Sequence, residues 1–230
     1  MATGCDGAEP LFRAEGTFIF ADLAGFTALT EAHGDESAAD LAHEFVCAAA
    51  PVLSECGAEQ VKTLGDALML RVPEPAAAIR LGLLLANDLL SGYGYPDVRV
   101  GMHHGTAVSR DGDWFGSTVN IASRIGALAG RRQVLASQAV ADAAGDIPGV
   151  SLTPLGPRSL RNIPVPVELF EAEWADRPAR ESVLDPVCQM TLDTDHAPHR
   201  LRHDGTMYYF CSAACAGKFA ASPESYPQGR

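Results

Sequence analysis

The stretch Thr17-Phe-Ile-Phe-Ala-Asp-Leu-Ala-Gly-Phe-Thr27 decides the fold. The run from Thr17 to Ala21 is apolar or β-branched, which predicts a buried strand that ends at the carboxylate of Asp22. Gly25 lets the backbone turn, and a helix is expected to open at Phe26 and Thr27. An acid at a strand end, followed by free N–H groups at a helix start, suits cations and phosphates together. An aspartate in such a place is more often a turn residue or a helix cap, so partners elsewhere in the chain must decide.

The composition is that of a folded acidic protein. The chain has 230 residues, 47% of them apolar, and a net charge of −12. This charge argues against a general affinity for nucleic acid or anionic lipid. No secretory signal is visible in Met1–Pro10, and the apolar stretch Ala76–Leu90 is interrupted by Arg80, Asn87 and Asp88. We therefore expect a cytoplasmic protein that contacts neither membrane nor nucleic acid.

Hydrophobic spacing along the chain predicts strands that alternate with helices, together with one hairpin that turns at Gly65-Asp66. This order favours an α/β sandwich with a mixed sheet. Residues 112–116 are expected to form a loop. Beyond the opening strand, the expected strands cover 60–64, 67–72, 97–109, 134–136, 150–155 and 167–173, and the expected helices cover 37–56, 76–90, 117–129 and 137–144.

The composition changes at Glu173, which divides the chain into two units. A unit of about 40 residues is too small to be stable from its core alone, so the second unit needs an additional stabilising element. Three of the six cysteines cluster there and are the obvious candidates. We expect a tail at 1–15, a catalytic domain at 16–174, a linker at 175–184, a small Cys-containing domain at 185–226 and a tail at 227–230.

Two further features could act with Asp22. Asp66 places a second carboxylate at the hairpin turn, and two such acids at the ends of neighbouring strands can bind a pair of Mg²⁺ ions. Asn120 and Arg124 lie four residues apart and so share one helix face. A planar guanidinium suits the charge of a phosphoryl transition state. Taken alone, the Asn120–Arg124 pair would more often be a solvated helix face.

Four segments, in order over about residues 16–173, resemble the class III nucleotide cyclase catalytic domain. This resemblance implies conversion of ATP to 3′,5′-cyclic AMP and pyrophosphate, in a ferredoxin-like α/β fold that works as a dimer. Any one of the motifs is modest evidence, whereas four in register are strong. The segments are Phe20–Thr27, Val61–Asp66, Arg99–Gly105 and Asp113–Arg124.

The resemblance also implies roles for individual residues. Asp22 and Asp66 match the aspartates that hold two Mg²⁺ or Mn²⁺ ions, and Lys62 and Asp113 match the pair that reads the purine. Adenine offers an acceptor at N1 and a donor at N6, which Lys62 and Asp113 satisfy respectively. Guanine presents the opposite pattern and would leave these groups unmatched, so ATP is expected over GTP.

Asn120 and Arg124 match the transition-state pair, and Arg99 matches a basic residue near the pyrophosphate. Gly25, Phe26 and Thr27 would supply backbone N–H groups to the phosphates. In the family, metal residues and base-reading residues come from opposite partners, so a chain that carries both would form a homodimer with two equivalent sites. We expect His103 and His104, in the third matching segment, to be structural.

The C-terminal unit resembles the YHS domain, a small module associated with heavy-metal handling. The resemblance rests on Asp185–Met190 and Tyr208–Cys215, and covers about residues 185–226. The thiols of Cys188, Cys211 and Cys215 suit Zn²⁺ or another thiophilic metal such as Cu(I), and the alternative is that they pack as reduced core residues. The sequence leaves the fourth ligand open among His196, His199, His203 and water.

The chain departs from the usual YHS pattern at Gln189, where glycine is common. Two functions follow from the two resemblances. The first is an adenylate cyclase regulated by metal or redox state through the C-terminal unit. The alternative is a catalytically silent cyclase-like dimer that serves as a metal-binding scaffold. Silent relatives typically lose a metal aspartate or the transition-state pair, and this chain keeps both.

Overall fold

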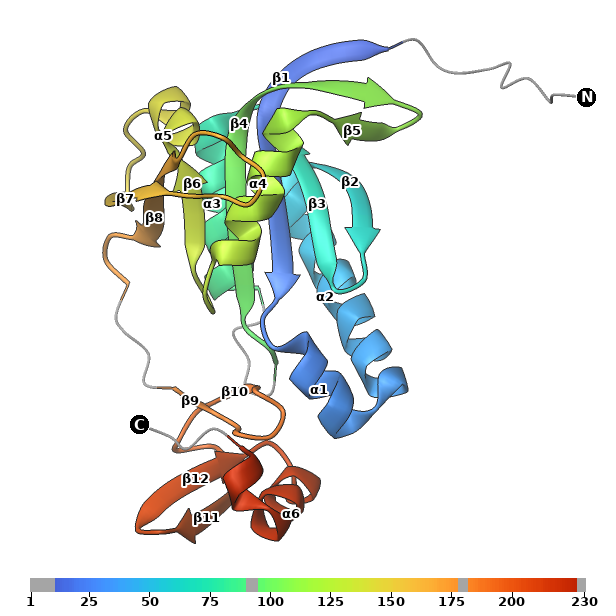
Figure 1. Ribbon diagram of the computed structural model, residues 1–230, viewed down its shortest axis with the longest axis vertical. Helices are drawn as coiled ribbons and strands as arrows, with labels where there is room; N and C mark the ends of the chain where they lie inside the picture. The colour runs from blue at the N-terminus through green and yellow to red at the C-terminus, as the bar shows by residue number, and fades with distance from the viewer. Residues whose placement is uncertain (1–10, 90–94, 178–181, 227–230) are drawn as a thin grey trace, which may run out of the picture.

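The computed structural model describes residues 11–89, 95–177 and 182–226. A mixed sheet carries helices on both faces, and a small C-terminal unit lies against the end of the sheet where β1 (Phe12–Leu23) runs into α1 (Phe26–His33) (Figure 1). The predicted α/β fold with a small Cys-containing unit is confirmed.

The main sheet is built around β1, which pairs antiparallel with β3 and β4. Its strand order is β2-β3-β1-β4-β6-β8-β7, with the short β5 attached to β4. Only the β4–β6 pairing is parallel among the described strands. After β1 the strands are β2 (Glu59–Leu64), β3 (Ala67–Val72), β4 (Val98–Arg110), β5 (Asp113–Phe115), β6 (Val134–Ser137), β7 (Val150–Arg158) and β8 (Val167–Trp174).

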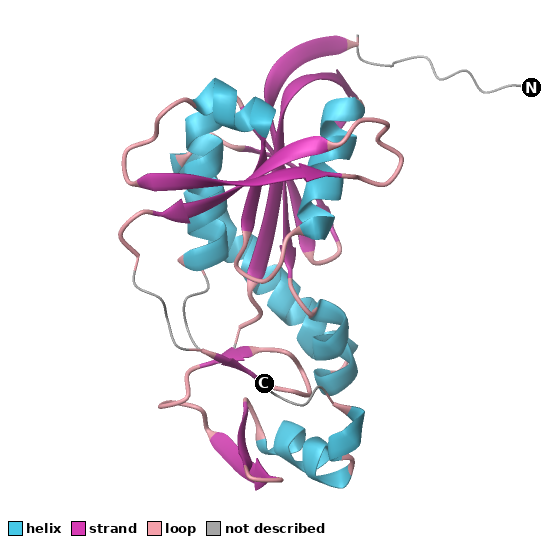
Figure 2. Cartoon of the chain, turned by 60° about the vertical axis from the view of Figure 1, so that its left-hand side comes forward, coloured by secondary structure: helices cyan, strands magenta, loops and turns pink. Residues whose placement is uncertain are grey.

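Alternate residues of β1 face opposite helix layers, as the period of a strand requires. Ile19 and Ala21 lie in the large core beneath three of the helices, whereas Phe18 faces the other layer and packs near Trp114. Figure 2 shows helices on either side of the sheet. The helices after α1 are α2 (Asp35–Glu55), α3 (Pro75–Asn87), α4 (Ser117–Leu128) and α5 (Gln138–Ala144).

Two expectations about strands need correction. β1 begins at Phe12 and not at Thr17, because Phe12–Gly16 pairs with the second half of β4. Residues 112–116, expected as a loop, contain β5, which folds back on β4 by pairing Asp113 with Arg110. Three residues between glycines are too few to show a strand period.

The close packing of α4 against the sheet depends on two glycines. A Cβ built on Gly101 of β4 would lie 2.0 Å from the backbone nitrogen of Gly126, so only hydrogen allows this approach. A Cβ on Gly126 would lie 3.1 Å from that of Phe20 in β1. The helix that carries Asn120 and Arg124 therefore lies directly on the centre of the sheet.

The C-terminal unit shares its core with the larger one. Leu29 of α1 and Ala38 of α2 are buried in one cluster with Phe210 and Phe219. The unit thus gains apolar contacts that its own length could not supply. Its elements are β9 (Val183–Leu184), β10 (Thr191–Leu192), β11 (His199–His203), β12 (Thr206–Phe210), α6 (Ala213–Ala221) and a 3₁₀ turn (Pro223–Ser225).

β9 lies within the segment that the sequence suggested as a linker, and it pairs with β10. Within the described part of the chain, no helix has the length and apolar character needed to span a membrane.

Candidate active site and a Cys/His cluster

Two carboxylates meet at the end of the sheet where β1 finishes. Asp22 is the penultimate residue of β1 and lies opposite Ala67, and Asp66 occupies the turn just before that residue. Burial, followed by the charge of Asp22, raises the pKa of Asp66 to about 6. Two neighbouring carboxylates repel each other when both are ionised, and their oxygens are hard donors. Such a pair suits a divalent cation such as Mg²⁺ or Mn²⁺.

Arg99 contacts the first of these carboxylates. It stands opposite Asp22 in the β1–β4 register, donates its Nε–H to Asp22 Oδ2 at 2.7 Å and contacts the same oxygen through Nη2. The structure thus places Arg99 at the end of the sheet that carries Asp22 and Asp66. Its expected contact with the pyrophosphate stays a prediction.

The two residues expected to read the purine form an ion pair. Lys62 Nζ donates to Asp113 Oδ2 at 2.5 Å, across 51 positions of sequence. The backbone N–H of Trp114 donates to the other oxygen of Asp113 at 2.8 Å. Burial alone would raise the pKa of Asp113, but the hydrogen bond and charge of Lys62 hold it below its ordinary value. The β4–β5 turn that the sequence missed is what brings Asp113 to β2.

Asn120 and Arg124 share one side of α4, as their spacing predicts, and this side is exposed. The buried side of the same helix carries Val119, Ala122 and Ile125. Within the described residues, neither the side chain of Asn120 nor that of Arg124 has a hydrogen-bond or ion-pair partner. Their polar groups are therefore available to bind a ligand or another molecule.

The two strand histidines behave as expected of structural residues. His103 Nδ1 and Ser137 Oγ share a hydrogen bond of 2.7 Å, and His104 Nδ1 and Thr17 Oγ1 share one of 3.0 Å. Burial lowers the pKa of His103 to about 4, with a smaller effect from His104. A ring that stays neutral to this pH packs as a hydrogen-bonded core group.

The turn between β1 and α1 is crowded by other parts of the chain. Gly25 has φ +86°, and a Cβ there would lie 2.5 Å from Arg131 Nη2 and 3.0 Å from the Cβ of Gln189. Glycine is therefore required both by the dihedral and by the space. Phe26 and Thr27 follow at the helix start, where backbone N–H groups lack intrahelical acceptors.

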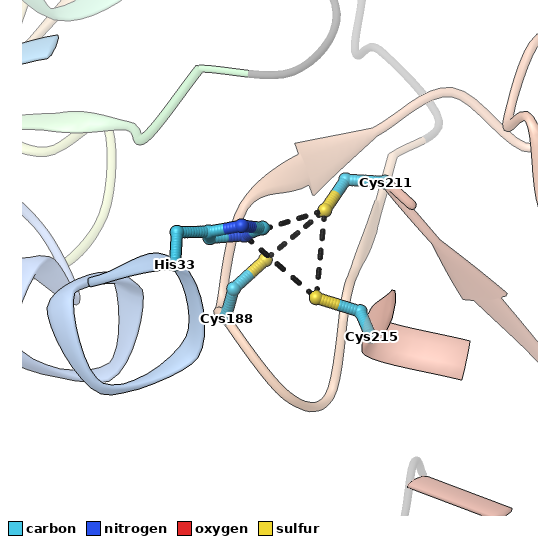
Figure 3. Close-up of side chains that lie close together, drawn as sticks. All are labelled: His33, Cys188, Cys211 and Cys215. Carbon is cyan, nitrogen blue, oxygen red and sulfur yellow. Dashed lines mark hydrogen bonds between the residues drawn. The ribbon is translucent and has the colours of Figure 1, made fainter. Parts of the chain in front are cut away.

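The three cysteines of the C-terminal unit converge with a histidine from α1 (Figure 3). Each of the four residues offers one ligand atom, and these atoms all lie within 4.8 Å of one another. The histidine is His33, the last residue of α1, and not one of the C-terminal histidines that the sequence suggested. His196 pairs with Asp193 and His203 with Asp204. No spacing motif joins His33 to Cys188, because 155 positions separate them.

A buried carboxylate shapes the loops that hold the cysteines. Asp185 has no exposed surface and accepts hydrogen bonds from the backbone N–H groups of Val187 at 2.9 Å and Cys211 at 2.8 Å. The hydrogen bond to Cys211 raises the pKa of the Cys188 thiol, and burial raises that of Cys215 to about 12. One carboxylate thus ties together two segments 26 positions apart.

Gln189, the departure from the YHS pattern, has φ +63°. This left-handed conformation explains why glycine is common there, and it costs a non-glycine residue about 1 kcal/mol. In return, Gln189 contacts the larger unit. Arg131 donates to its backbone oxygen at 2.9 Å and to its Oε1 at 3.3 Å, and also to the backbone oxygen of Ala24 at 3.0 Å.

Comparison with known proteins agrees with this geometry. The model of the adenylate and guanylate cyclase catalytic domain matches residues 13–162, and that of the YHS domain matches 183–230. The chain is 41% identical over 157 residues to a pH-sensitive adenylate cyclase of Mycobacterium tuberculosis, covering 67% of this chain and 39% of that protein. It is 37% identical over 123 residues to an adenylate cyclase of Streptomyces coelicolor, covering 54% and 32%. The chain thus spans less than half the length of these relatives.

A shorter match joins the chain to a protein with a different name. The chain is 48% identical over 51 residues to a copper-transporting P-type ATPase of Rhizobium leguminosarum, covering 22% of this chain and 6% of that protein. Among solved structures, the adenylyl cyclase CyaB of Pseudomonas aeruginosa superposes with a TM-score of 0.66 at 19% identity, over 74% of this chain and all of that one. An adenylate/guanylate cyclase/hydrolase of Silicibacter pomeroyi superposes at 0.62 with 25% identity, over 73% and 100%. The chain belongs to the adenylate and guanylate cyclase catalytic domain family.

Proposed function

We propose that the chain is an adenylate cyclase that converts ATP to 3′,5′-cyclic AMP and pyrophosphate. The observation that carries the proposal is the Lys62–Asp113 ion pair, because it presents a donor and an acceptor side by side. This pattern matches N1 and N6 of adenine and mismatches guanine. The names of the two bacterial relatives support the same substrate.

In the reaction, the ribose 3′-hydroxyl gives up its proton to water, its oxygen bonds to the α-phosphorus, and the bond from that phosphorus to the leaving pyrophosphate breaks. Arg124 donates to the α-phosphoryl oxygens as charge builds on them, and Asn120 orients the ribose. Two cations held by Asp22 and Asp66 would add positive charge at the phosphates. The N–H groups of Gly25, Phe26 and Thr27 bind the phosphates, and Arg99 lies nearby to contact the pyrophosphate.

Two copies of the chain supply each site. Asn120 and Arg124 face away from their own protomer, which suits groups that act on a nucleotide held by the partner. The apolar side chains of Phe115, just before α4, and Leu128, at its end, are each about half exposed and favour contact with a second copy. A symmetric dimer would then contain two equivalent sites.

The test is the formation of cyclic AMP and pyrophosphate from ATP by the purified chain, with Mg²⁺ or Mn²⁺ and with GTP as the comparison substrate. We expect equal amounts of the two products, a strong preference for ATP, and loss of turnover in Asp22→Ala. If a verified dimer makes no product with either metal, the scaffold alternative holds instead.

The C-terminal unit binds a thiophilic metal and regulates turnover, and the reaction takes place in the cytoplasm, where ATP is abundant. The convergence of three thiols supports metal binding. Full turnover after removal of residues 183–230 would argue against the regulatory part.

A further inference from the structure

We propose that His33 and the three cysteines bind one Zn²⁺ ion, and that this ion fastens the C-terminal unit to helix α1 beside the catalytic site. The site is shared, because its imidazole comes from the cyclase domain and its thiols come from the C-terminal unit (Figure 3). The consequence for turnover rests on the proposed cyclase activity, whereas the metal site itself does not.

The spacing of the donor atoms fits a tetrahedral zinc ion. Sulfur at about 2.3 Å and nitrogen at about 2.1 Å from zinc lie about 3.8 Å (S to S) and about 3.6 Å (S to N) apart in a tetrahedron. Cys211 Sγ is 3.5 Å from Cys188 Sγ and 3.7 Å from Cys215 Sγ. His33 Nε2 is 3.6 Å from Cys211 Sγ and 3.7 Å from Cys215 Sγ. These four separations lie within about 0.3 Å of the tetrahedral values.

The chemical types of the four donor atoms limit which metals the site would bind. Three thiolates and one imidazole form one of the usual structural zinc sets, whereas Fe–S clusters usually take four cysteines. Among the residues that the structure describes, this is the one group of three or more His, Cys, Asp and Glu side chains close enough to hold a metal together. Asp185 fixes the loops of Cys188 and Cys211 through their backbone N–H groups, so the thiols are held before metal arrives.

Helix α1 connects this metal site to the catalytic one. It has eight residues, about 12 Å of helix, and runs from the turn after Asp22 to His33. The C-terminal unit contacts both of its ends. Lys218 Nζ donates to the backbone oxygen of Ala32 at 2.7 Å, and Gln189 meets Gly25 and Arg131 at the start of the helix.

Because α1 is held at both ends by the unit that carries the thiols, zinc restricts the turn that faces the nucleotide phosphates. We therefore expect zinc to rigidify α1 and to raise turnover. Metal binding and helix protection report on the shared site directly, and cyclic AMP formation reports on its consequence.

The first experiment measures metal binding by the full chain, using competition against a chromogenic chelator, and uses Co²⁺ as a spectroscopic probe. We expect one zinc per chain and the d–d absorption of a tetrahedral cobalt site. His33→Ala should weaken zinc binding by about 100-fold or more, since four ligands share the binding free energy. His33→Cys should restore affinity and strengthen the sulfur-to-cobalt charge-transfer band.

Matched controls separate this site from others. His199→Ala changes an exposed histidine of the C-terminal unit, and Cys47→Ser changes an exposed cysteine of α2. Neither should alter zinc affinity. Unchanged affinity and cobalt spectrum in His33→Ala would overturn the shared site, as would a preference for Cu(I) bound by the three sulfurs without the imidazole.

The second experiment measures hydrogen–deuterium exchange in residues 26–33 with and without zinc. Zinc should slow exchange in the wild type but not in His33→Ala. Gln189→Gly relieves the left-handed strain and removes the side-chain bond to Arg131, so it should keep zinc affinity while weakening protection at the start of α1. Equal protection with and without zinc in the wild type would overturn the link to α1.

Removal of zinc should lower turnover of the wild type several-fold and leave His33→Ala unchanged. If zinc binds and protects α1 as expected but no cyclic AMP forms in any state, the cyclase proposal fails and the shared site stands. If cyclic AMP forms equally with and without zinc, the regulatory consequence fails.

Discussion

The two candidate sites of this chain differ in how complete they are within one protomer. The Cys/His cluster brings four donors within 4.8 Å of one another. In the proposed catalytic set, Lys62 and Asp113 pair with each other, whereas the side chains of Asn120 and Arg124 face outward without a partner among the described residues. One site can be recognised by convergence in a single copy. The other is recognised by exposed polar side chains that have no hydrogen-bond or ion-pair partner among the described residues of the same copy.

The largest expected effect tests whether the catalytic set is divided between two copies. Asp66→Ala and Arg124→Ala should each lower turnover by about 10³-fold, because each removes charge that the transition state needs. A mixture of the two variants should recover about a quarter of wild-type turnover, since half of the dimers are mixed and each mixed dimer has one intact site.

The measurement is cyclic AMP formation against the ratio of the two variants, after exchange of subunits has been verified. Each variant should bind zinc as the wild type does, because the Cys/His cluster is complete in one copy. If mixing restores no turnover, the divided site is wrong.

The next effect concerns the base-reading pair. The double variant Lys62→Glu, Asp113→Lys keeps an ion pair but exchanges donor and acceptor. It should lower kcat/KM for ATP by about 10²-fold or more and favour GTP, because guanine presents the opposite pattern at N1 and O6. Steady-state kinetics with both nucleotides measure the change. An unchanged preference for ATP would show that this pair does not read the base.

A smaller effect tests how the Cys/His cluster is supported. Asp185→Ala leaves the N–H groups of Val187 and Cys211 without their charged acceptor, and should cost about 2 kcal/mol of unfolding free energy in the C-terminal unit. Thermal unfolding with added zinc, and exchange of the backbone amides, measure it. Asp195→Ala, at an exposed position, should change stability by less than about 0.5 kcal/mol. Equal stability of the two variants would contradict the supporting role.

The smallest effect is a dependence on pH in the core of the cyclase domain. His103 has a pKa of about 4 when folded and an ordinary value of 6.5 when unfolded. Between these values the unfolded chain binds more protons, so stability is lost as pH falls from 6.5 to 4 and is regained as pH rises. His103→Asn should reduce the loss of unfolding free energy between pH 6.5 and pH 4 by less than about 1 kcal/mol. The reduction is small because the ring is partly exposed and solvent screens the effect.

Urea unfolding of the full chain at several pH values between 4 and 7 measures the slope. His43→Asn, at an exposed position on α2, serves as the control and should leave the slope unchanged. An identical slope in wild type and His103→Asn would show that the pKa of His103 is not lowered in the folded chain.

Local patterns predicted most of the fold. The hairpin at Gly65-Asp66, the start of α1 after Gly25 and the helix that carries Asn120 and Arg124 are all visible as periodicity and turn residues. β5 escaped prediction because three residues show no period, and it is the element that brings Asp113 to Lys62.

The metal ligands show the same limit at longer range. The three cysteines could be named from sequence because two of them lie four positions apart on a strand-to-helix turn. His33 could not, because it belongs to the other domain and its approach depends on how the two units pack. One feature of the sequence was related to that packing, namely Gln189 in a place where glycine is usual. Its backbone is left-handed, and it contacts Arg131 of the larger unit.

The shared apolar cluster of Leu29 and Ala38 with Phe210 and Phe219 also has a consequence for synthesis on the ribosome. Domains generally fold from the N-terminus as the chain emerges. Helices α1 and α2 are therefore made long before the residues that cover them, and the apolar surface of Leu29 stays open to water while the remaining sheet is translated. Helix α1 is therefore covered only after the C-terminal unit, which follows the sheet in the sequence, has been translated.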